Sequence, residues 1–292
     1  MTADGDFVDL DWLAAPAPPG APLLLVLHGL EGSARSHYAA GLLGCARAAG
    51  WRAVVLNFRS CSGELNRRPR FYHSGETGDL DEVVACLVGR EPRVRLGAVG
   101  VSLGANVLLK WLGERGGAAP LAGAVGISVP FDLEACARAL ARGFGRAVDT
   151  AHFLRTMRRK VADKARAYPG FVDVRAARAA RTFAAYDRAV TAPLHGFVDE
   201  VDYWRRTSCG PWLPRVARPT LLLNALDDPL VPAEALPSPA SLPGHVRAEF
   251  PPRGGHAGFL QGPPWRVESW AERRAVEFLR PLLQPDGGRP VW

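Results

Sequence analysis

The residues of this sequence best suited to covalent chemistry are Ser102 and its neighbours. Residues 100–104 read Gly-Val-Ser-Leu-Gly, after the apolar run Val94–Val101 and at the start of a helical stretch, Ser102–Gly113. A G-x-S-x-G sequence between a strand and a helix is typical of a nucleophile elbow, a strained turn that exposes the serine hydroxyl. Side chains in place of the two glycines would clash with the strand and the helix. An ordinary glycine-rich turn is the plainer alternative.

A serine hydroxyl becomes a good nucleophile only when a base takes its proton. On folds that carry such an elbow, the partners follow in the order serine, acid, histidine. Of the seven histidines, only His245 and His256 lie late enough in the chain. His256 follows a candidate strand in the flexible sequence Arg-Gly-Gly-His-Ala-Gly-Phe and is the predicted base. His245 precedes that strand, which indicates a surface loop.

Two adjacent carboxylates compete for the role of the acid. Asp227 and Asp228 follow the predicted strand Pro219–Ala225. The acid must hold the histidine tautomer and stabilise the imidazolium. The arrangement Asp-x-x-Val-Pro favours Asp228 and leaves Asp227 as a turn residue.

A tetrahedral intermediate also needs hydrogen-bond donors for its oxyanion. We expect one donor to be the backbone N–H of Leu103, after the nucleophile, and the other the N–H of Leu30. Gly29, between His28 and Leu30, permits close backbone approach. His28 stands at a strand end, where a structural hydrogen bond is favoured over catalysis.

Three other reactive side chains are given non-catalytic roles. Cys61 is predicted to be an ordinary thiol rather than a second nucleophile, since no histidine partner is evident. His73 either lines a pocket or ties down its loop. His195 is expected to pack a lid.

The elements that must position these residues alternate along the chain. Apolar runs predict strands at Leu23–Leu27, Arg52–Phe58, Val94–Val101, Leu121–Val129, Pro219–Ala225 and Val246–Phe250. Helical patterns lie at Ala39–Ala49, 78–89, Ser102–Gly113 and Ser269–Leu283. This alternation predicts an α/β fold with a mostly parallel, doubly wound sheet.

Residues 131–217 break the alternation and read as a helical cap, or lid, inserted into a core formed by residues 1–130 and 218–292. The insertion holds 16 basic and 9 acidic residues, which accounts for the whole net charge of +7. Either it weakly contacts anionic lipid, or codon bias supplied the arginines and the lid is simply solvated. Its aromatic residues pack the lid or line an acyl pocket: Phe131, Phe144, Phe153, Phe171, Phe183, Phe197, Tyr203, Trp204 and Trp212.

Composition places the chain among globular proteins. It has 292 residues, of which 48% are hydrophobic and 22% charged. The first twelve residues contain no basic side chain, and the longest apolar run is far below the roughly 20 residues of a membrane span. We therefore expect a soluble, cytoplasmic protein. The five cysteines have no metal-type spacing and are expected to be reduced. No nucleic-acid-binding motif is evident, and the sequence does not fix an oligomeric state.

With these residues placed, the chain resembles the YheT-like branch of the α/β-hydrolases, which is related to the ABHD lipases and esterases. The resemblance covers about residues 23–283. It is carried by these strings: His28-Gly29-Leu30-Glu31-Gly32-Ser33 with Ser36-His37-Tyr38, Val55-Leu56-Asn57-Phe58-Arg59, Cys61-Ser62-Gly63-Glu64, Asn66-Arg67, Tyr72-His73-Ser74-Gly75-Glu76-Thr77, the Ser102 motif, Ala192-Pro193-Leu194-His195-Gly196-Phe197, Leu222-Leu223-Asn224-Ala225 with Asp227-Asp228-Pro229, and Gly254-Gly255-His256-Ala257-Gly258-Phe259. Ser60 and Ala105 stand where the family pattern commonly has glycine.

The resemblance implies a capped α/β-hydrolase fold with Ser102, Asp228 and His256 as the catalytic triad. It implies hydrolysis of carboxylic esters, including lipid-like ones, with no cofactor and no metal. The Ser102 and His256 motifs predict an acyl-enzyme mechanism, and the apolar and aromatic residues of the insertion predict a preference for short-to-medium acyl esters. Two alternatives remain open: an acyltransferase that uses the same triad, and a non-catalytic protein that binds surfaces through its basic insertion.

Overall fold

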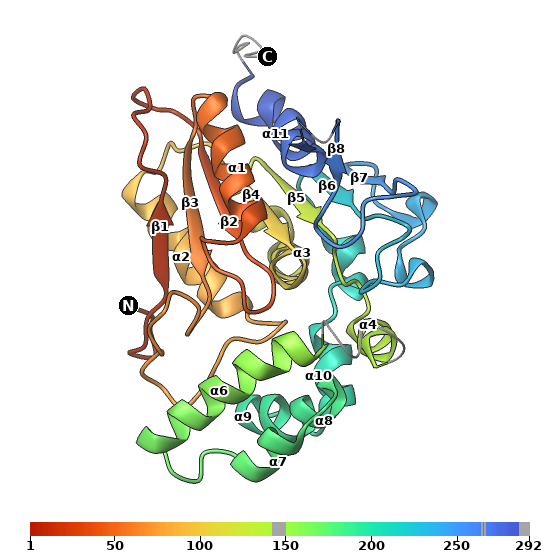
Figure 1. Ribbon diagram of the computed structural model, residues 1–292. Coiled ribbons are helices and arrows are strands. Elements are labelled where there is room, and N and C mark those ends of the chain that lie inside the picture. Colours follow the sequence, from red (N-terminus) through yellow and green to blue (C-terminus); the bar gives the residue numbers. More distant parts are fainter. Residues whose placement is uncertain (142–149, 264, 266, 286–292) are drawn as a thin grey trace.

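A seven-stranded sheet forms the centre of the molecule (Figure 1). The computed structural model describes residues 1–141, 150–263, 265 and 267–285. The strands lie in the order β1-β3-β2-β4-β5-β6-β7, and every neighbouring pair is parallel except β1 with β3. Their bounds are β1 Asp9–Trp12, β2 Leu23–Leu27, β3 Arg52–Asn57, β4 Leu96–Val101, β5 Gly123–Ile127, β6 Thr220–Leu223 and β7 Val246–Glu249. The mostly parallel sheet confirms the predicted fold class.

Helices cover both faces of this sheet. On one face lie α1 (His37–Ala48) and α11 (Trp270–Leu283), which pack together with one side of the strands. On the other face lie α2 (Thr77–Arg90) and α3 (Leu103–Arg115), which form a second core with the opposite side of the strands. Strands buried on both faces have no polar side to alternate with, so β2 reads Leu-Leu-Leu-Val-Leu and is buried throughout.

Several predicted strands run beyond the observed ladders. Leu121–Val129 contains β5, Gly123–Ile127, and Pro219–Ala225 contains β6, Thr220–Leu223. The added residues Val129 and Ala225 are nonetheless fully buried. An apolar run indicates which residues are buried, not where strand pairing ends. At the carboxyl edge of the sheet the buried residues continue past the last hydrogen-bonded residue, so the predicted strands are too long there.

The predicted strands do not include β1, Asp9–Trp12, whose sequence Asp-Leu-Asp-Trp contains no apolar run. This segment pairs antiparallel with β3, with Asp9 opposite Asn57 and Trp12 opposite Val54. Its four residues are half-buried or exposed, as expected at a sheet edge. A two-residue pair, β8 (Leu260–Gln261) with β9 (Glu268–Ser269), was also missed because such short pairs have no readable period.

Within the residues that the structure describes, segment 131–217 consists of helices joined by short turns and contains no strand. It contains α4 Leu133–Leu140, α6 Ala151–Ala167, α7 Val174–Ala179, α8 Phe183–Tyr186, the π-helical η3 Asp187–Thr191, α9 Ala192–His195, α10 Glu200–Thr207 and the 3₁₀ turn η4 Gly210–Arg215. Helices α6 to α10 form a layer below the carboxyl edge of the sheet (Figure 1). Phe144 and the tail residues 286–292 lie outside the described residues.

The layer of α6 to α9 has a small core of its own. Leu154 and Val161 of α6 pack with Tyr186, with Val190, and with Phe71 from the loop after β3. Among the described helices, none is both long and apolar enough to cross a membrane.

Candidate active site

Ser102 lies in a sharp turn between β4 and α3. Its φ of 54° and ψ of −122° are strained for a residue with a side chain. A Cβ on Gly100 would lie 2.5 Å from the Cα of Ala105, and a Cβ on Gly104 would lie 2.5 Å from the carbonyl oxygen of His28. Backbone atoms cannot yield to such contacts, so both motif glycines are required by close packing of strand, turn and helix.

A continuous hydrogen-bond chain links Ser102, His256 and Asp228. The distance from Ser102 Oγ to His256 Nε2 is 2.9 Å, and His256 Nδ1 lies 2.8 Å and 3.1 Å from the two carboxylate oxygens of Asp228. The Asp228 side chain is fully buried. Its Oδ1 also accepts the N–H groups of Leu230 and Val231. A proton on Nδ1 therefore faces the carboxylate, which leaves Nε2 to accept from the serine hydroxyl.

Asp227 points to a different part of the same loop. Its Oδ1 accepts the N–H groups of Gly254 and Gly255 at 2.9 Å and 2.8 Å. It therefore ties down the loop that carries His256 without contacting the imidazole. The structure thus separates the two candidate carboxylates by their partners.

The loop of His256 is also fixed from β5. The N–H of Ala257 donates to Ser128 Oγ at 2.9 Å, and Ser128 is fully buried directly after β5. Sequence reasoning missed Ser128, since only its place after a strand could have marked it. His245, the other late histidine, lies 2.5 Å from the carbonyl of Val216 through Nε2 and contacts none of the three residues above.

The two expected oxyanion donors lie on the loops beside Ser102. Leu103 is the first residue of α3, so its N–H has no carbonyl partner within the helix. The N–H of Leu30 donates no hydrogen bond within the part of the chain that the structure describes. A Cβ on Gly29 would lie 3.2 Å from the Cβ of Ser102, so this loop passes directly over the serine.

His28 is built into the core. Its Nδ1 lies 2.7 Å from the carbonyl of Gly29, and the N–H of Phe58 donates to its Nε2 at 3.1 Å. Burial lowers the pKa of His28 to about 4. The ring is neutral with both nitrogens engaged, which agrees with a structural role and leaves it no lone pair for a base.

Residues 22–263 match the α/β-hydrolase fold family. The chain belongs to this family. It is 41% identical to "Putative esterase YheT" of Escherichia coli, over 96% of this chain and 83% of that protein. It is 28% identical to the human "Phospholipase ABHD3", over 97% of this chain and 71% of that protein. These relatives confirm the predicted YheT-like branch and an enzyme of the esterase and lipase type.

A solved structure agrees with this α/β-hydrolase fold. An esterase of Pyrococcus furiosus, Pf2001, matches with a TM-score of 0.62 and 16% identity, over 96% of this chain and 88% of that one. At this identity the likeness supports the fold alone.

Next to Ser102 and His256 this α/β-hydrolase has a largely apolar cavity of about 140 Å³. Segment 131–217 supplies much of its wall. The apolar side chains from that segment include Leu140, Phe153, Met157, Phe183, Tyr186 and Leu194. Of the aromatic residues predicted to pack or to line a pocket, Phe153, Phe183, Tyr203 and Trp204 line it, whereas Phe131 packs in the main core.

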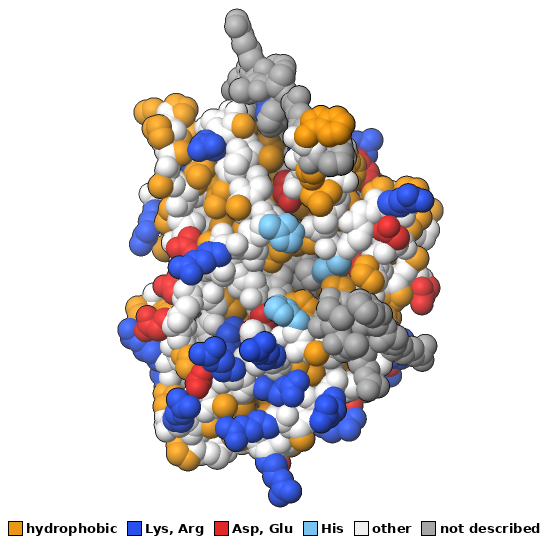
Figure 2. Space-filling view, in the orientation of Figure 1, with side chains coloured by type: hydrophobic (Ala, Val, Ile, Leu, Met, Phe, Trp, Pro, Cys, Tyr) orange, Lys and Arg blue, Asp and Glu red, His pale blue; other side chains and the backbone are white. Residues whose placement is uncertain are grey.

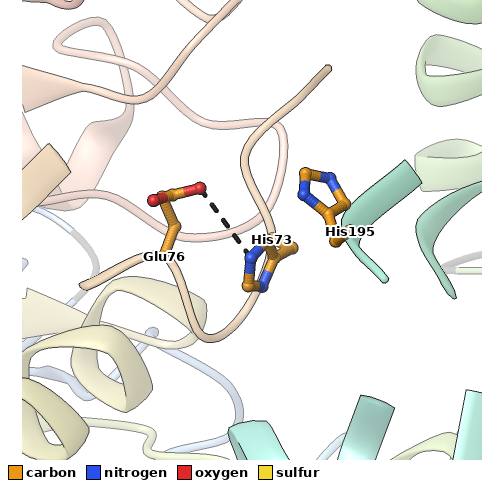
Figure 3. A group of neighbouring side chains, drawn as sticks. All are labelled: His73, Glu76 and His195. Carbon is orange, nitrogen blue, oxygen red and sulfur yellow. Dashed lines mark ion pairs between the residues drawn. The ribbon is translucent and has the colours of Figure 1, made fainter. Parts of the chain in front are cut away.

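One wall of the cavity carries two imidazoles (Figure 3). The rings of His73 and His195 are 4.4 Å apart between centroids. Burial holds the pKa of His73 well below its usual range, and burial with the charges of Arg70 and Arg59 lowers that of His195 to about 4. The sequence left two roles open for His73, and it has both, since its Nδ1 accepts the N–H of Gly75 within the loop.

His73, Glu76 and His195 bring their possible metal-ligand atoms within 4.8 Å of one another. Two imidazoles and a carboxylate are a common donor set for divalent metals. However, Nδ1 of His73 accepts a hydrogen bond, so its proton lies on Nε2, the nitrogen 3.8 Å from Glu76. Arg70 also pairs with Glu76. Two of the three candidate ligands, His73 through Nδ1 and Glu76 through its carboxylate, therefore already have polar partners within the protein.

The loop after β3 is fixed by buried polar groups. Arg59 pairs with the buried carboxylates of Asp6 and Asp79. Ser60 has a φ of 65°, a backbone conformation that favours glycine. Its hydroxyl bonds the side chain and the N–H of Asn66, and these bonds hold the strained turn.

Cys61 lies in this loop as a thiol. Burial raises its pKa to about 11, although the Lys160 ammonium opposes the shift. A thiol that stays protonated at neutral pH is a poor nucleophile, as the sequence analysis expected.

Proposed function

We propose that the chain hydrolyses carboxylic esters through an acyl-enzyme on Ser102, with His256 as the base and Asp228 as its orienting carboxylate. The observation that carries this proposal is the hydrogen-bond chain from Ser102 Oγ through the imidazole to the buried carboxylate. The relatives named as esterase, phospholipase and monoacylglycerol lipase support an ester as the substrate.

The chemistry follows from the positions of these groups. Ser102 Oγ attacks the ester carbonyl while His256 Nε2 takes the proton of the serine hydroxyl. The oxyanion that forms accepts hydrogen bonds from the backbone N–H groups of Leu30 and Leu103. The C–O bond to the alcohol then breaks, and the imidazolium gives its proton to that oxygen. A water, deprotonated by His256, attacks the acyl-enzyme, and the acid and free Ser102 are released.

The cavity supports an acyl chain of short-to-medium length. Its size is close to that of a cavity that holds a single benzene ring. Its wall is mostly apolar, which suits the acyl part of an ester. We infer that segment 131–217 is a cap over a core of residues 1–130 and 218–292, because α4, α6 and α8 supply this wall.

A series of p-nitrophenyl esters graded by acyl length tests this function. We expect a maximum of kcat/KM at short-to-medium chains and loss of about 10⁶ in kcat in Ser102→Ala. Hydrolysis that survives in Ser102→Ala would overturn the assignment. Added glycerol separates hydrolysis from acyl transfer, since a transferase would release acylated glycerol in place of the free acid.

A further inference from the structure

The loop that carries Leu30 is held in place by its neighbour Glu31. Glu31 has a φ of 55°, a region that residues with a side chain rarely adopt. Its N–H donates to the Tyr72 hydroxyl at 2.7 Å, and that hydroxyl lies 3.0 Å from Glu31 Oε1. One phenol thus holds both the backbone and the side chain of Glu31.

Tyr72 is itself fixed by the core. Its ring is buried and stacks on Phe58, with centroids 5.2 Å apart and planes 7° apart. The N–H of Phe58 bonds to His28, which in turn contacts the carbonyl of Gly29. Leu30 therefore lies between two held residues. Gly29 is held through His28 and Phe58, and Glu31 is held through Tyr72, whose ring stacks on Phe58.

Lys160 adds a contact from segment 131–217. This residue of α6 donates from Nζ to Glu31 Oε1 at 2.8 Å, lies 3.4 Å from Cys61 Sγ, and has its Nζ 5.9 Å from the centroid of the Tyr72 ring. The side chains of Lys160 and Glu31 are only 21% and 7% exposed, so solvent screens the ion pair weakly. Through Lys160, α6 reaches the loop of the proposed oxyanion donor.

We propose that Lys160 is a positioning residue which, through Glu31 and Tyr72, sets the N–H of Leu30 for the oxyanion. The inference rests on the proposed function. It makes the contact of Lys160 with Glu31, rather than the general packing of α6, a condition for a competent oxyanion hole. A misplacement of about 1 Å can cost about 100-fold in rate, so the contact acts on the transition state more than on substrate binding.

A second lysine of α6 provides a matched control. Lys164, one turn later, is buried and donates from Nζ to the carbonyl of Asn66 at 2.6 Å, to Asn66 Oδ1 at 2.7 Å and to the carbonyl of Arg68 at 2.7 Å. It anchors the same helix to the core but contacts neither Glu31 nor Tyr72. Loss of Lys164 therefore weakens the seating of α6 without releasing Glu31.

The test compares Lys160→Met with Lys164→Met in the full chain. A p-nitrophenyl ester gives kcat and KM, and a trifluoromethyl ketone, whose adduct with serine carries an oxyanion, gives a transition-state affinity. We expect Lys160→Met to lower kcat by about 10- to 100-fold, to weaken the affinity for the ketone by a similar factor, and to leave KM nearly unchanged.

Lys164→Met should lower Tm and change kcat by less than about 3-fold. Lys160→Arg, which retains the ion pair, should recover most of the rate.

Glu31→Gln keeps a side-chain oxygen for Tyr72 but removes the charge that Lys160 meets. It should lower kcat as Lys160→Met does, and the double variant should be no worse than either single one, because coupled residues are not additive. Equal losses of kcat in Lys160→Met and Lys164→Met would overturn the proposal, and so would additive losses in the double variant of Lys160→Met with Glu31→Gln. Either result would show that Lys160 only stabilises the packing of α6. If Lys160→Met does not fold, the comparison of Glu31→Gln with Lys164→Met decides in the same way. Activity that persists in Ser102→Ala would instead remove the proposed function.

Discussion

At the scale of single residues, the adjacent carboxylates of Asp227 and Asp228 bind different parts of the loop that carries His256. Asp228 is buried and faces the imidazole of His256, whereas Asp227 is exposed and holds the backbone that carries this histidine. The two residues lie in a turn in which the N–H of Asp228 donates to the carbonyl of Ala225, and from this turn one aspartate reaches the imidazole and the other the returning loop.

This division predicts unequal effects of two matched substitutions. Asp228→Asn should lower kcat by roughly 10⁴, because an amide no longer holds the proton on Nδ1 of His256. Asp227→Asn should lower kcat by less than about 10-fold, because the amide oxygen still accepts the N–H groups of Gly254 and Gly255. Steady-state kinetics of the two variants, with circular dichroism to check folding, measures the difference. The reverse order would make Asp227 the acid.

At the scale of elements, backbone strain gathers at the carboxyl edge of the sheet. The non-glycine residues with positive φ in the described chain all lie in loops at this edge. Glu31, Ser60, Ser102 and Ser128 follow β2, β3, β4 and β5. Ala257 and Phe259 lie in the loop that follows β7. Such strain persists only where surrounding contacts hold it, and it is common at functional sites.

Two glycine substitutions test the elbow. Gly104→Ala would place a methyl group 2.5 Å from the carbonyl oxygens of Leu27 and His28, so we expect a loss of about 1–3 kcal/mol in unfolding free energy and a large loss of kcat. Gly44→Ala is the control, because Gly44 is exposed in α1 with no heavy atom near its Cβ position. It should stabilise the protein by about 1 kcal/mol. Urea unfolding measures both, and a neutral Gly104→Ala would contradict the packing described for the elbow.

At the scale of the whole molecule, the structure holds one fully buried imidazole, His28, and two partly buried ones, His73 and His195. Burial is the main cause that lowers the pKa of His28 and of His195 to about 4, and that of His73 well below 6.5. In the unfolded chain these rings bind protons near pH 6.5, so between pH 6.5 and about 4 the unfolded state holds more protons. Stability therefore rises with pH across this window and is lost as the pH falls from 6.5 towards 4.

Removing one of these rings should flatten that dependence. We expect His195→Gln, which cannot be protonated, to show a smaller fall in the urea midpoint between pH 6.5 and 4.5 than the unsubstituted protein. His245→Gln is a suitable control, because the His245 side chain lies outside this buried group. An unchanged pH slope in His195→Gln would show that other groups dominate acid unfolding.

Charge is also distributed at this scale. Basic side chains gather over the lower part of the face in Figure 2, where Figure 1 places α6 and α7. Residues 151–181 expose six arginines: Arg155, Arg159, Arg166, Arg175, Arg178 and Arg181. Each basic side chain near an anionic membrane contributes about 1 kcal/mol within a Debye length.

This surface predicts weak, salt-sensitive binding to anionic vesicles and none to neutral ones. Co-sedimentation with phosphatidylserine-containing and pure phosphatidylcholine vesicles, each at low and high salt, measures it. Arg175→Glu with Arg178→Glu should weaken the anionic binding without changing kcat on a soluble ester, because both side chains are exposed on α7 and line no part of the cavity. Equal, negligible sedimentation in both vesicles would leave the charge as a solvating surface.

The sequence by itself determined the features that depend on local pattern. The glycines around Ser102, the buried strand runs, and the order of Ser102, Asp228 and His256 along the chain indicated the fold and the candidate triad. These signals are readable because steric exclusion at an elbow and burial on both faces of a sheet act on neighbouring residues.

Only the tertiary structure decided the contacts between distant segments. Ser128 fixes the loop of His256 across 129 positions, and Lys160 reaches Glu31 across the same separation. The edge strand β1 was likewise fixed by its partner β3 rather than by its own pattern. A side chain that acts through a partner far along the chain leaves no periodicity in the sequence, since its role is set by how strands, loops and helices pack together.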